Sequence, residues 1–421
     1  MTELIQATVA KLREKYNDQI VGEAMSQFEK LRFGVSEITP ETELLEMLAD
    51  SLHANKPLRV KCGIDPTGSD IHLGHLVPFR KMRQFQDLGH IGVVIIGDYT
   101  ASIGDPTGRN EARTSLDADT VALNARTYMD QVYTVVDRSK TEVCFQSEWF
   151  NSVTLRDVIT WCAQTTVAKL LSHETFSERL ESGHSLSLHE LFYPVLQGID
   201  SVYVKADVEL GGSDQKFNVL MGRDYQKARN QRPQVAVLLP IITGTCGTKK
   251  MSKSLNNYIG INDEPFDKFG KIMSIPDRLM GDYFKYLTNI SPQEFEQIMA
   301  GLEKGALHPN ETKKDLAQRI VTFFHGEAVG KEMRAQFEAV FKRGEVPEDT
   351  PEYTLGADNL ILNVLVGQGL VDSKKEARRL LQQNAIGFVN GDKITDESFS
   401  FSEAHSGLVV KVGKRKFLRI K

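Results

Sequence analysis

Two histidines lie three residues apart in His72-Leu73-Gly74-His75, after a predicted strand and at the start of a predicted helix that has Pro78 in its first turn. The N-terminus of a helix attracts anions, and imidazole N–H groups add directional donors. Gly74 lets a ligand approach the main chain closely. The segment therefore favours a phosphate ligand. A pair of surface histidines is the alternative, whereas a metal site lacks an evident third ligand.

A basic segment, Lys250-Met251-Ser252-Lys253-Ser254, lies in a stretch rich in Gly, Thr and Lys that indicates a mobile loop. Two lysines three residues apart, flanked by small hydroxyl residues, suit a loop that closes on a polyphosphate. An exposed basic loop would explain this segment alone, but not its ordered pairing with the histidines upstream. The two segments together predict a nucleotide site.

Three polar side chains, Tyr193, Gln197 and Asp200, recur at helical spacing in an apolar stretch. At about 100° per residue they fall within ~60° of one another on one helix face. A phenol, a carboxamide and a carboxylate beside an apolar pocket suit a small zwitterionic ligand, and an exposed polar stripe is the alternative. Pro194 predicts a kink or local break in this helix.

The paired segments resemble the class I aminoacyl-tRNA synthetases, which combine a HIGH-type element, here residues 72–75, with a KMSKS loop, here residues 250–254. The polar helix resembles the Y-x-x-x-Q-x-x-D helix of the tyrosyl-tRNA synthetases. Residues 97–109 and 211–215 are similar to that family's G-D-x-T-A-x-I-G-D-P-S/T-G and G-G-S-D-Q segments. The implied chemistry is attack of an amino-acid carboxylate on the α-phosphorus of ATP, which needs positioning and charge stabilisation.

The resemblance implies a role for individual residues of this sequence. The catalytic residues would be His72, His75, Lys250 and Lys253. The ATP site would comprise these four and Cys62, Gly63, Asp65, Thr67, Gly74, Gly212, Asp214, Met251 and Ser252. The tyrosine site would comprise Asp105, Tyr193, Gln197, Asp200 and Gln215, with Asp200 accepting the phenol O–H. Arg109 and Arg113 would lie on the phosphate or acceptor-stem side; ATP would enter with Mg²⁺, and no metal-binding residue is expected.

Two positions depart from the family pattern. Many bacterial tyrosyl enzymes have a tyrosine that contacts the substrate phenol where this sequence has Lys61, and an asparagine where it has Gln146. Either another group completes the phenol site, or Asp200 carries more of the recognition. These changes suggest a divergent branch of the family.

The elements that must position these residues alternate between strands and helices. Apolar or β-branched runs predict strands at 58–63, 92–97, 142–145, 207–210 and 235–239, with helices such as 122–136 and 214–229 between them. This alternation predicts an α/β fold with a parallel sheet covered by helices. Residues 1–56 look helical, with a helix start at Thr39-Pro40-Glu41.

The predicted secondary structure and the composition change along the chain, and these changes predict several domains. A Rossmann-like catalytic domain with N-terminal helices would span 1–247, and the KMSKS loop with an α-helical tRNA-binding domain 248–343. An acidic, proline-containing linker would span 344–357, and a small α+β RNA-binding domain 358–421. This last segment resembles a domain shared by a ribosomal small-subunit protein (S-four type) and bacterial tyrosyl-tRNA synthetases.

The last segment is the basic part of an acidic chain. Residues 358–421 contain eleven Lys and Arg against seven Asp and Glu, a net charge of +4, so the rest of the chain carries −9 of the total of −5. Ser373 and Glu376 form a predicted capping box that opens a short helix. Its basic residues, the predicted tRNA contacts, are Lys374, Lys375, Arg378 and Arg379.

Composition limits the class of protein. The 421 residues are 41% hydrophobic and 25% charged, which excludes wholesale disorder. The four cysteines form no C-x-x-C pair and suit a reducing cytosol. Neither a signal peptide nor an apolar run of the ~20 residues that a membrane helix needs is seen. A cytoplasmic enzyme without membrane contact is therefore expected.

The partners implied by the resemblance are L-tyrosine, ATP and tRNA(Tyr), with a homodimer as the usual assembly. Two alternatives stay open. One is the sister enzyme for tryptophan, which the Tyr193, Gln197 and Asp200 helix disfavours because tryptophan offers its N–H elsewhere. The other is a non-catalytic RNA-binding relative, which the intact His72 and Lys250 segments disfavour.

Overall fold

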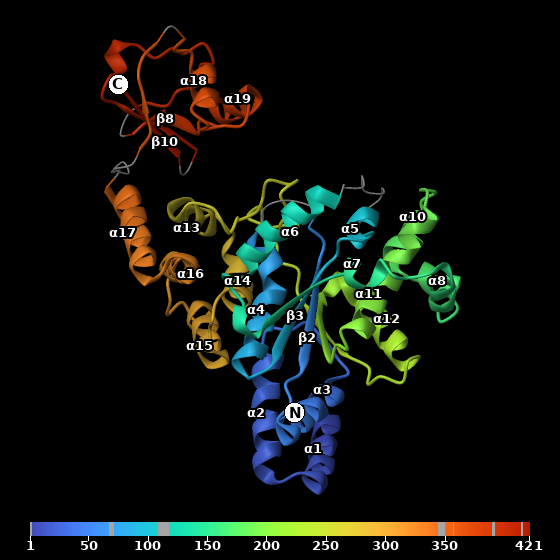
Figure 1. Cartoon of the computed structure of the whole chain (residues 1–421). Helices are drawn as coiled ribbons and strands as arrows, with labels where there is room; N and C mark the ends of the chain where they lie inside the picture. The colour runs from blue at the N-terminus through green and yellow to red at the C-terminus, as the bar shows by residue number, and fades with distance from the viewer. Residues whose placement is uncertain are drawn as a thin grey trace. The chain divides into compact units, whose positions relative to one another are not determined.

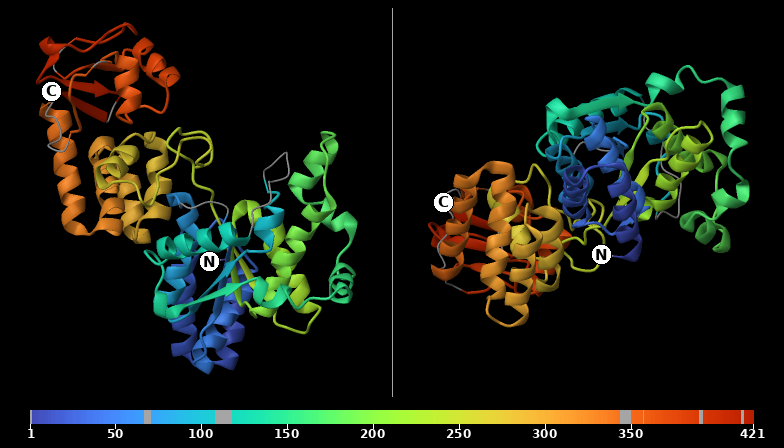
Figure 2. Two further views of the ribbon diagram at one scale, coloured as in Figure 1. Left: turned by 45° about the horizontal axis from the view of Figure 1, so that its top comes forward. Right: turned by 90° about the horizontal axis from the view of Figure 1, so that it is seen from below.

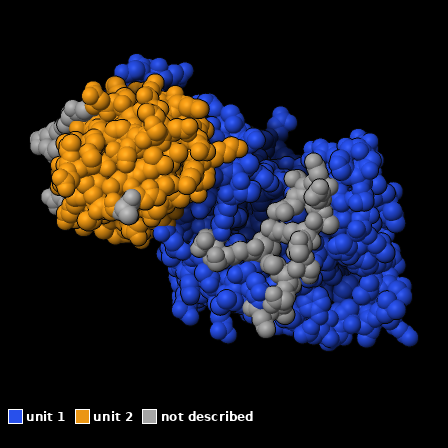
Figure 3. Space-filling model, turned by 90° about the horizontal axis from the view of Figure 1, so that it is seen from above, with its two compact units in different colours: residues 1–262, 275–307 blue, residues 263–274, 308–421 orange. Residues whose placement is uncertain are grey.

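The computed structural model describes residues 2–66, 71–107, 118–343, 350–356, 358–389, 392–413 and 416–421. Of the predicted site residues, Thr67, Arg109 and Arg113 lie outside these ranges. Contacts divide the chain into two compact units, residues 1–262 with 275–307 and residues 263–274 with 308–421 (Figure 3). The functional boundaries at 247 and 343 stay predictions.

The first unit contains a six-stranded sheet in the order β1-β6-β5-β2-β3-β4 (Figure 1). All neighbours pair in parallel except β1, which is antiparallel to β6 at one edge. The strands are β1 (Glu37–Thr39), β2 (Arg59–Ile64), β3 (Ile91–Ile96), β4 (Thr141–Phe145), β5 (Val208–Gly212) and β6 (Val235–Leu239). The five predicted strands and the α/β class are confirmed, and β1 was too short to be recognised.

Helices cover both faces of this sheet, as Figures 1 and 2 show. The α-helices are α1 (Glu3–Lys15), α2 (Asp18–Arg32), α3 (Glu41–Ala54), α4 (Leu73–Asp87), α5 (Thr100–Ile103), α6 (Ala118–Val132), α7 (Ser147–Phe150), α8 (Leu155–Cys162), α9 (Val167–Leu171), α10 (Glu174–Glu181), α11 (Phe192–Tyr203), α12 (Lys216–Lys227), α14 (Met280–Leu287) and α15 (Pro292–Glu303). Four 3₁₀ turns join them: η1 (Arg138–Lys140), η2 (Leu188–Leu191), η3 (Ser213–Gln215) and η4 (Asp277–Leu279).

Strand β3 shows how the two faces are filled. At Gly92 an added Cβ would lie 2.5 Å from the sulfur of Met82 on α4, so any other residue here would force the Met82 side chain to move. The alternate residues Val93 and Ile95 pack instead in the cluster that contains Val195 and Ile199 of α11. Because successive side chains of a strand point to opposite faces, α4 and α11 cover opposite faces of the sheet.

The predicted helix start at Thr39-Pro40-Glu41 is confirmed, because α3 begins at Glu41 with Glu41 and Glu43 in its first turn. Pro40 rather than Thr39 is the cap residue, since Thr39 ends β1 and bonds Glu37. Two predictions about prolines are wrong. Pro78 lies inside α4 rather than in its first turn, and cannot donate to the carbonyl of Gly74 four residues earlier. Pro194 produces no break within α11, since the helix begins at Phe192 and the proline falls in its first turn.

The second unit begins with helices α13 (Pro265–Met273), α16 (Pro309–His325) and α17 (Glu327–Arg343). The helices predicted after the lysine loop are therefore confirmed. Among the described residues, no helix combines the length and the apolar character that crossing a membrane requires.

The rest of this unit is a small α+β module with its own hydrophobic core. A four-stranded sheet, in the order β7-β10-β9-β8, consists of β7 (Glu352–Tyr353), β8 (Ile386–Phe388), β9 (Val409–Val412) and β10 (Lys416–Ile420). It is accompanied by α18 (Ile361–Gly367), α19 (Lys374–Gln382) and the 3₁₀ turn η5 (Glu403–His405). The Oγ atom of Ser373 caps α19 as predicted, but the Glu376 carboxylate accepts from the N–H of Asp372 rather than completing the capping box.

Candidate active site

A cavity of about 430 Å³ in the first unit gathers nearly every described residue of the predicted ATP and tyrosine sites. It is lined by segments that follow β2, β3 and β5, where an open α/β sheet binds its ligands. Its lining includes the following predicted site residues: Cys62, Gly63, Asp65, His72, Gly74, His75, Asp105, Tyr193, Gln197, Asp200, Gly212, Asp214, Gln215, Lys250, Met251 and Ser252. Lys253 is absent from this lining.

The two histidines lie together at the start of α4. The N–H of His72, the cap residue, donates to Nδ1 of His75 at 3.3 Å, and the two rings stack at 3.7 Å between centroids. Burial lowers the pKa of His72 to about 2 and that of His75 to about 4, and the charge of Lys253 adds to both shifts. Both imidazoles are therefore neutral near pH 7 and can serve as N–H donors but not as cations.

The lysine loop is held by a buried amide, Asn257, that no sequence motif indicated. Its Nδ2 donates to the carbonyl of Lys250 at 3.0 Å, and its Oδ1 accepts from the N–H of Ser252 at 2.8 Å. Burial raises the pKa of Asp214, and the charge of Lys250 partly opposes this rise. The loop thus brings the charge of Lys250 to bear on Asp214 and that of Lys253 on the two histidines.

Asp200 is buried, and its carboxylate has two side-chain partners. Gln146 Nε2 donates to Oδ2 at 2.8 Å, and Trp149 Nε1 donates to Oδ1 at 3.2 Å. The oxygen of Gln146 accepts in turn from the N–H of Thr100 at 3.0 Å, which fixes the amide. Burial raises the pKa of Asp200 to about 7, against the lowering effect of the Lys61 ammonium.

A second carboxylate, Asp65, lies between two hydroxyl groups. Tyr193 donates to its Oδ2 at 2.9 Å and Thr100 donates to its Oδ1 at 2.7 Å. Asp65 therefore joins the segment after β2 to α5 and α11. Burial, with the charge of Asp65 adding to it, raises the pKa of Tyr193 well above its usual value, so this phenol stays protonated and keeps donating.

A third carboxylate, Asp105, is fixed by its own loop and by the turn after β5. Its Oδ1 accepts from the N–H of Thr107 at 2.9 Å, and its Oδ2 accepts from Gln215 Nε2 at 2.7 Å. The oxygen of Gln215 accepts from Asn218 Nδ2 at 2.9 Å. Among the described residues, the cavity is therefore lined by four carboxyl groups, those of Asp65, Asp105, Asp200 and Asp214, and such a set suits a cationic group such as an α-ammonium.

Comparison with known proteins identifies the family. Residues 53–342 match the family described as tRNA synthetases class I (W and Y), and residues 342–420 match the Tyrosine--tRNA ligase SYY-like C-terminal domain. The tyrosine–tRNA ligase of Carboxydothermus hydrogenoformans is 47% identical over 406 residues, covering 95% of this chain and 98% of the relative. That of Moorella thermoacetica is 46% identical over 399 residues, covering 94% and 96%. The chain belongs to the tyrosine–tRNA ligase family.

Solved structures of tyrosyl-tRNA synthetases share the fold of this tyrosine–tRNA ligase family member. The enzyme from Archaeoglobus fulgidus, complexed with L-tyrosine, has a TM-score of 0.60 at 20% identity and covers 74% of this chain and 99% of its own. A tryptophanyl-tRNA synthetase from Encephalitozoon cuniculi, bound to tryptophan, has a TM-score of 0.53 at 17% identity, covering 69% and 83%. The fold alone therefore does not separate the two amino acids.

Among the site residues of this tyrosine–tRNA ligase family member, several could not be found from local spacing. Trp149 and Glu209 reach the site from separate elements, and no motif of the family marks either of them. One signal was present: Lys61 is a charged residue inside an apolar strand, and Glu209 is another, in a strand predicted nearby. A charge in a buried strand needs an opposite charge, so the two could have been paired.

The four basic residues of α19 are all exposed, as a nucleic-acid contact requires. Arg378 contacts Glu397 at 2.7 Å and Arg379 contacts Glu376 at 3.7 Å. Such surface pairs are weak and exchange readily with phosphate partners. The RNA contact of this tyrosine–tRNA ligase module stays a prediction.

Proposed function

We propose that this chain joins L-tyrosine to the 3′ end of tRNA(Tyr) in two steps. First, a carboxylate oxygen of tyrosine attacks the α-phosphorus of ATP, the bond from that phosphorus to the bridging oxygen breaks, and tyrosyl-adenylate and pyrophosphate form. Second, a hydroxyl of the terminal ribose attacks the tyrosyl carbonyl carbon and AMP leaves. One observation carries the proposal: a single cavity contains both the stacked His72 and His75 and the buried carboxylate of Asp200.

In this proposal the phosphates of ATP are bound by two kinds of group, neutral N–H donors and positively charged side chains. The neutral His72 and His75 donate N–H groups to the phosphates, and Lys250 and Lys253 supply the positive charge that stabilises the pentacoordinate phosphorus. ATP enters as its Mg²⁺ complex, with the cation carried by the substrate phosphates. The proposal includes a cytoplasmic location, where charged tRNA is used.

The rest of the cavity selects the amino acid. Asp105, Tyr193 and the oxygen of Gln197 surround the α-ammonium group, while Asp200 accepts the phenol O–H. Trp149 and Gln146 donate to Asp200 and orient its carboxylate, which carries the recognition of the phenol. Tryptophan has no O–H to offer this carboxylate, so tyrosine is favoured.

Amino-acid-dependent exchange of pyrophosphate into ATP tests the proposal directly. The purified chain is incubated with ATP, labelled pyrophosphate, and tyrosine, tryptophan or phenylalanine in turn. Exchange is expected with tyrosine at concentrations where the other two give none. Exchange with tryptophan alone would assign the sister activity, and exchange with none would favour a non-catalytic RNA-binding protein.

The C-terminal module is proposed to bind tRNA and to raise its concentration at the active site. Removing residues 345–421 is expected to leave pyrophosphate exchange unchanged and to slow tRNA charging at least about tenfold, because each phosphate contact adds to affinity. Replacing Lys374, Lys375, Arg378 and Arg379 by alanine is also expected to weaken tRNA binding, measured as a higher KM for tRNA, while the module stays folded. Charging at full rate by both variants would remove the module from the mechanism.

A homodimer is the further part of the proposal, and an exposed apolar run supports it. Leu155 and Ile159, one turn apart on α8, are 75% and 62% exposed, and Val167 on α9 and Leu188 on η2 are exposed as well. Large apolar side chains exposed along consecutive elements are typical of a surface that a partner covers.

Sedimentation velocity tests this surface. The intact chain is expected to sediment as a dimer, and Leu155→Glu with Ile159→Glu as a monomer, because two buried carboxylates without partners oppose association. Leu4→Glu is the matched control, since Leu4 is 67% exposed on α1 and outside this run. A dimer that survives the double substitution would place the interface elsewhere.

A further inference from the structure

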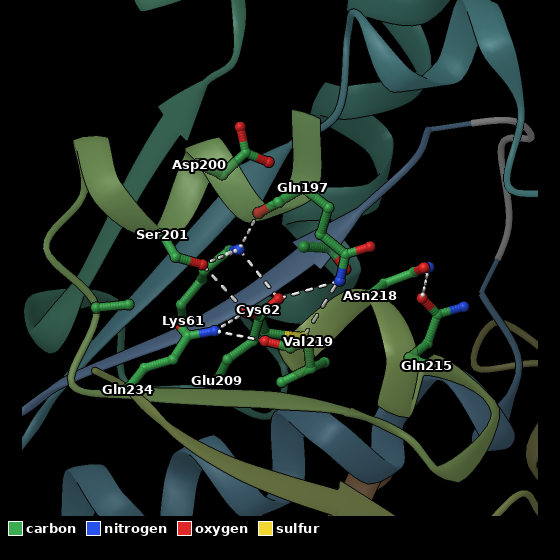
Figure 4. Close-up of polar contacts among 12 residues, drawn as sticks. Lys61, Cys62, Gln197, Asp200, Ser201, Glu209, Gln215, Asn218, Val219 and Gln234 are labelled. Carbon is green, nitrogen blue, oxygen red and sulfur yellow. Dashed lines mark hydrogen bonds and ion pairs between the residues drawn. The ribbon is translucent and has the colours of Figure 1, made fainter. Parts of the chain in front are cut away.

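A buried ion pair lies directly beneath the amino-acid end of the cavity. Lys61 and Glu209 are neighbours across the parallel strands β2 and β5, and their side chains are 0% and 1% exposed. The Lys61 Nζ atom is 3.0 Å from Oε1 of Glu209. In Figure 4 both side chains point toward helix α11, while the carboxylate of Asp200 on that helix points away from them.

Every donor of the ammonium group has a partner. Besides Glu209, the Lys61 Nζ atom donates to the carbonyl oxygen of Gln197 at 2.8 Å and to Oγ of Ser201 at 2.7 Å. An ammonium group has three N–H donors, so this set is complete. The ammonium group of Lys61 therefore binds Glu209 and two residues of α11, and it has no donor left for the phenol of the substrate.

The carboxylate of Glu209 is equally occupied. Its Oε1 accepts from Gln197 Nε2 at 3.1 Å, and its Oε2 accepts from Ser201 Oγ at 3.1 Å and from the side-chain amide of Gln234 (Figure 4). The pair thus reaches Gln197 twice, at its main-chain carbonyl and at its side chain. Gln197 is the only member of this cluster among the described residues that also lines the cavity.

The chemistry of these groups decides which end of the Gln197 carboxamide faces the cavity. An ionised carboxylate can only accept hydrogen bonds, so Gln197 must turn its NH₂ group to Glu209, and its oxygen is left on the other side. The Lys61 ammonium, 3.0 Å from Oε1, balances the charge of the Glu209 carboxylate, and both carboxylate oxygens act as acceptors.

We propose that Lys61 and Glu209 are positioning residues for amino-acid recognition, which hold the Gln197 carboxamide with its oxygen toward the substrate's α-ammonium group. The inference rests on the proposed function, in which Gln197 contacts that group. An ammonium group is donor-only, so a reversed carboxamide would present NH₂ to it and lose the contact. The ion pair therefore acts on the amino group and not on the phenol.

Binding of two ligands that differ only in the amino group isolates this effect. Isothermal titration calorimetry measures the dissociation constants of tyrosine and of 3-(4-hydroxyphenyl)propanoate, which keeps the phenol and carboxylate but lacks the amine. The preference for tyrosine is the ratio of the two constants, so any change at Asp200 cancels. In Lys61→Met/Glu209→Met this preference is expected to fall about tenfold or more, the value of a hydrogen bond to a charged group.

The double substitution replaces a buried ion pair by apolar side chains of similar volume, which folded proteins often tolerate. Ser201→Ala is the matched control, because it removes a bond to Oε2 and leaves the bond between Oε1 and Gln197 in place. It is expected to keep the tyrosine preference within about twofold of the unaltered chain, because the bonds that it removes, to the Lys61 ammonium and to Oε2 of Glu209, do not involve the carboxamide of Gln197. An unchanged preference in the double variant would overturn the inference.

A measurement on the unaltered chain covers the case in which the double variant fails to fold. The side-chain amide signal of Gln197, assigned by its loss in Gln197→Met, is followed by nuclear magnetic resonance with ¹⁵N-labelled glutamine. The NH₂ group of Gln197 is expected to exchange its hydrogens slowly both without ligand and with tyrosine, because it is bonded to Glu209 in either case. Slow exchange that appears only when tyrosine is bound would overturn the inference. Failure of the unaltered chain to bind tyrosine would instead overturn the proposed function on which it rests.

Discussion

Asp200→Ala is expected to remove most of the discrimination between tyrosine and phenylalanine, measured as the ratio of kcat/KM in pyrophosphate exchange. With the carboxylate present, phenylalanine leaves a buried acceptor without its O–H donor. Leaving such a group unpaired is costly, whereas an extra hydroxyl in an apolar site is a small penalty. Tyrosyl-tRNA synthetases are the standard example of this rule, and the factor of about 10⁵ known for them is an established value, not a new prediction.

The effect should come mainly from slower use of tyrosine. Alanine also leaves Gln146 Nε2 and Trp149 Nε1 without their acceptor, so the phenol end of the cavity becomes poorly ordered. Asp130→Ala is the matched control, because Asp130 is an exposed carboxylate on α6. A tyrosine-to-phenylalanine ratio equal to that of the unaltered chain would exclude Asp200 as the group that reads the phenol.

The pH dependence of tyrosine binding gives a second measure of the same residue. Burial raises the pKa of the Asp200 carboxyl to about 7, so the better acceptor, the ionised form, becomes populated as the pH rises through 7. The KM for tyrosine should therefore fall between pH 6 and pH 8. Asp200→Asn, which has no proton to lose, should flatten this dependence.

Lys253→Ala is expected to slow formation of tyrosyl-adenylate about 10²- to 10³-fold, the usual loss when one group that stabilises transition-state charge is removed. The expectation follows from the protonation of the site. His72 and His75 have pKa values lowered to about 2 and 4, so they bring no positive charge near pH 7. The positive charge that the protein itself places at the phosphates therefore comes from the loop lysines, and the charge of Lys253 lowers the pKa of both imidazoles.

Rapid-quench measurement of a single turnover separates this step from substrate binding. The rate constant should fall while the dissociation constants of tyrosine and ATP change little, because the charge acts chiefly in the transition state. Lys249→Ala is the matched control, since Lys249 is an exposed lysine of the same loop just outside the motif. Equal losses in both variants would mean that the loop attracts ATP by its overall charge only.

Local patterns were a good guide to the elements of this protein. The apolar runs that became β3, β5 and β6 are short and largely buried, so their pattern marks strands covered on both faces, whereas the edge strand β4 is only partly buried. Predictions that depended on the exact start of a helix did less well. Pro78 and Thr39 satisfy the composition rule for a helix start, but packing of α4 and pairing of β1 with β6 set the actual boundaries.

The amino-acid sequence by itself determined the reaction class. The histidine pair, the lysine loop and the polar helix are each formed by residues close together in the chain, so the residue types and their spacing within each motif indicate its chemistry. Only the tertiary structure decided how the phenol site is completed. Gln146 and Trp149 converge on Asp200 from beyond β4, and Glu209 meets Lys61 across two strands. Such contacts join residues far apart in the chain, so their geometry arises only when the sheet and α11 have packed.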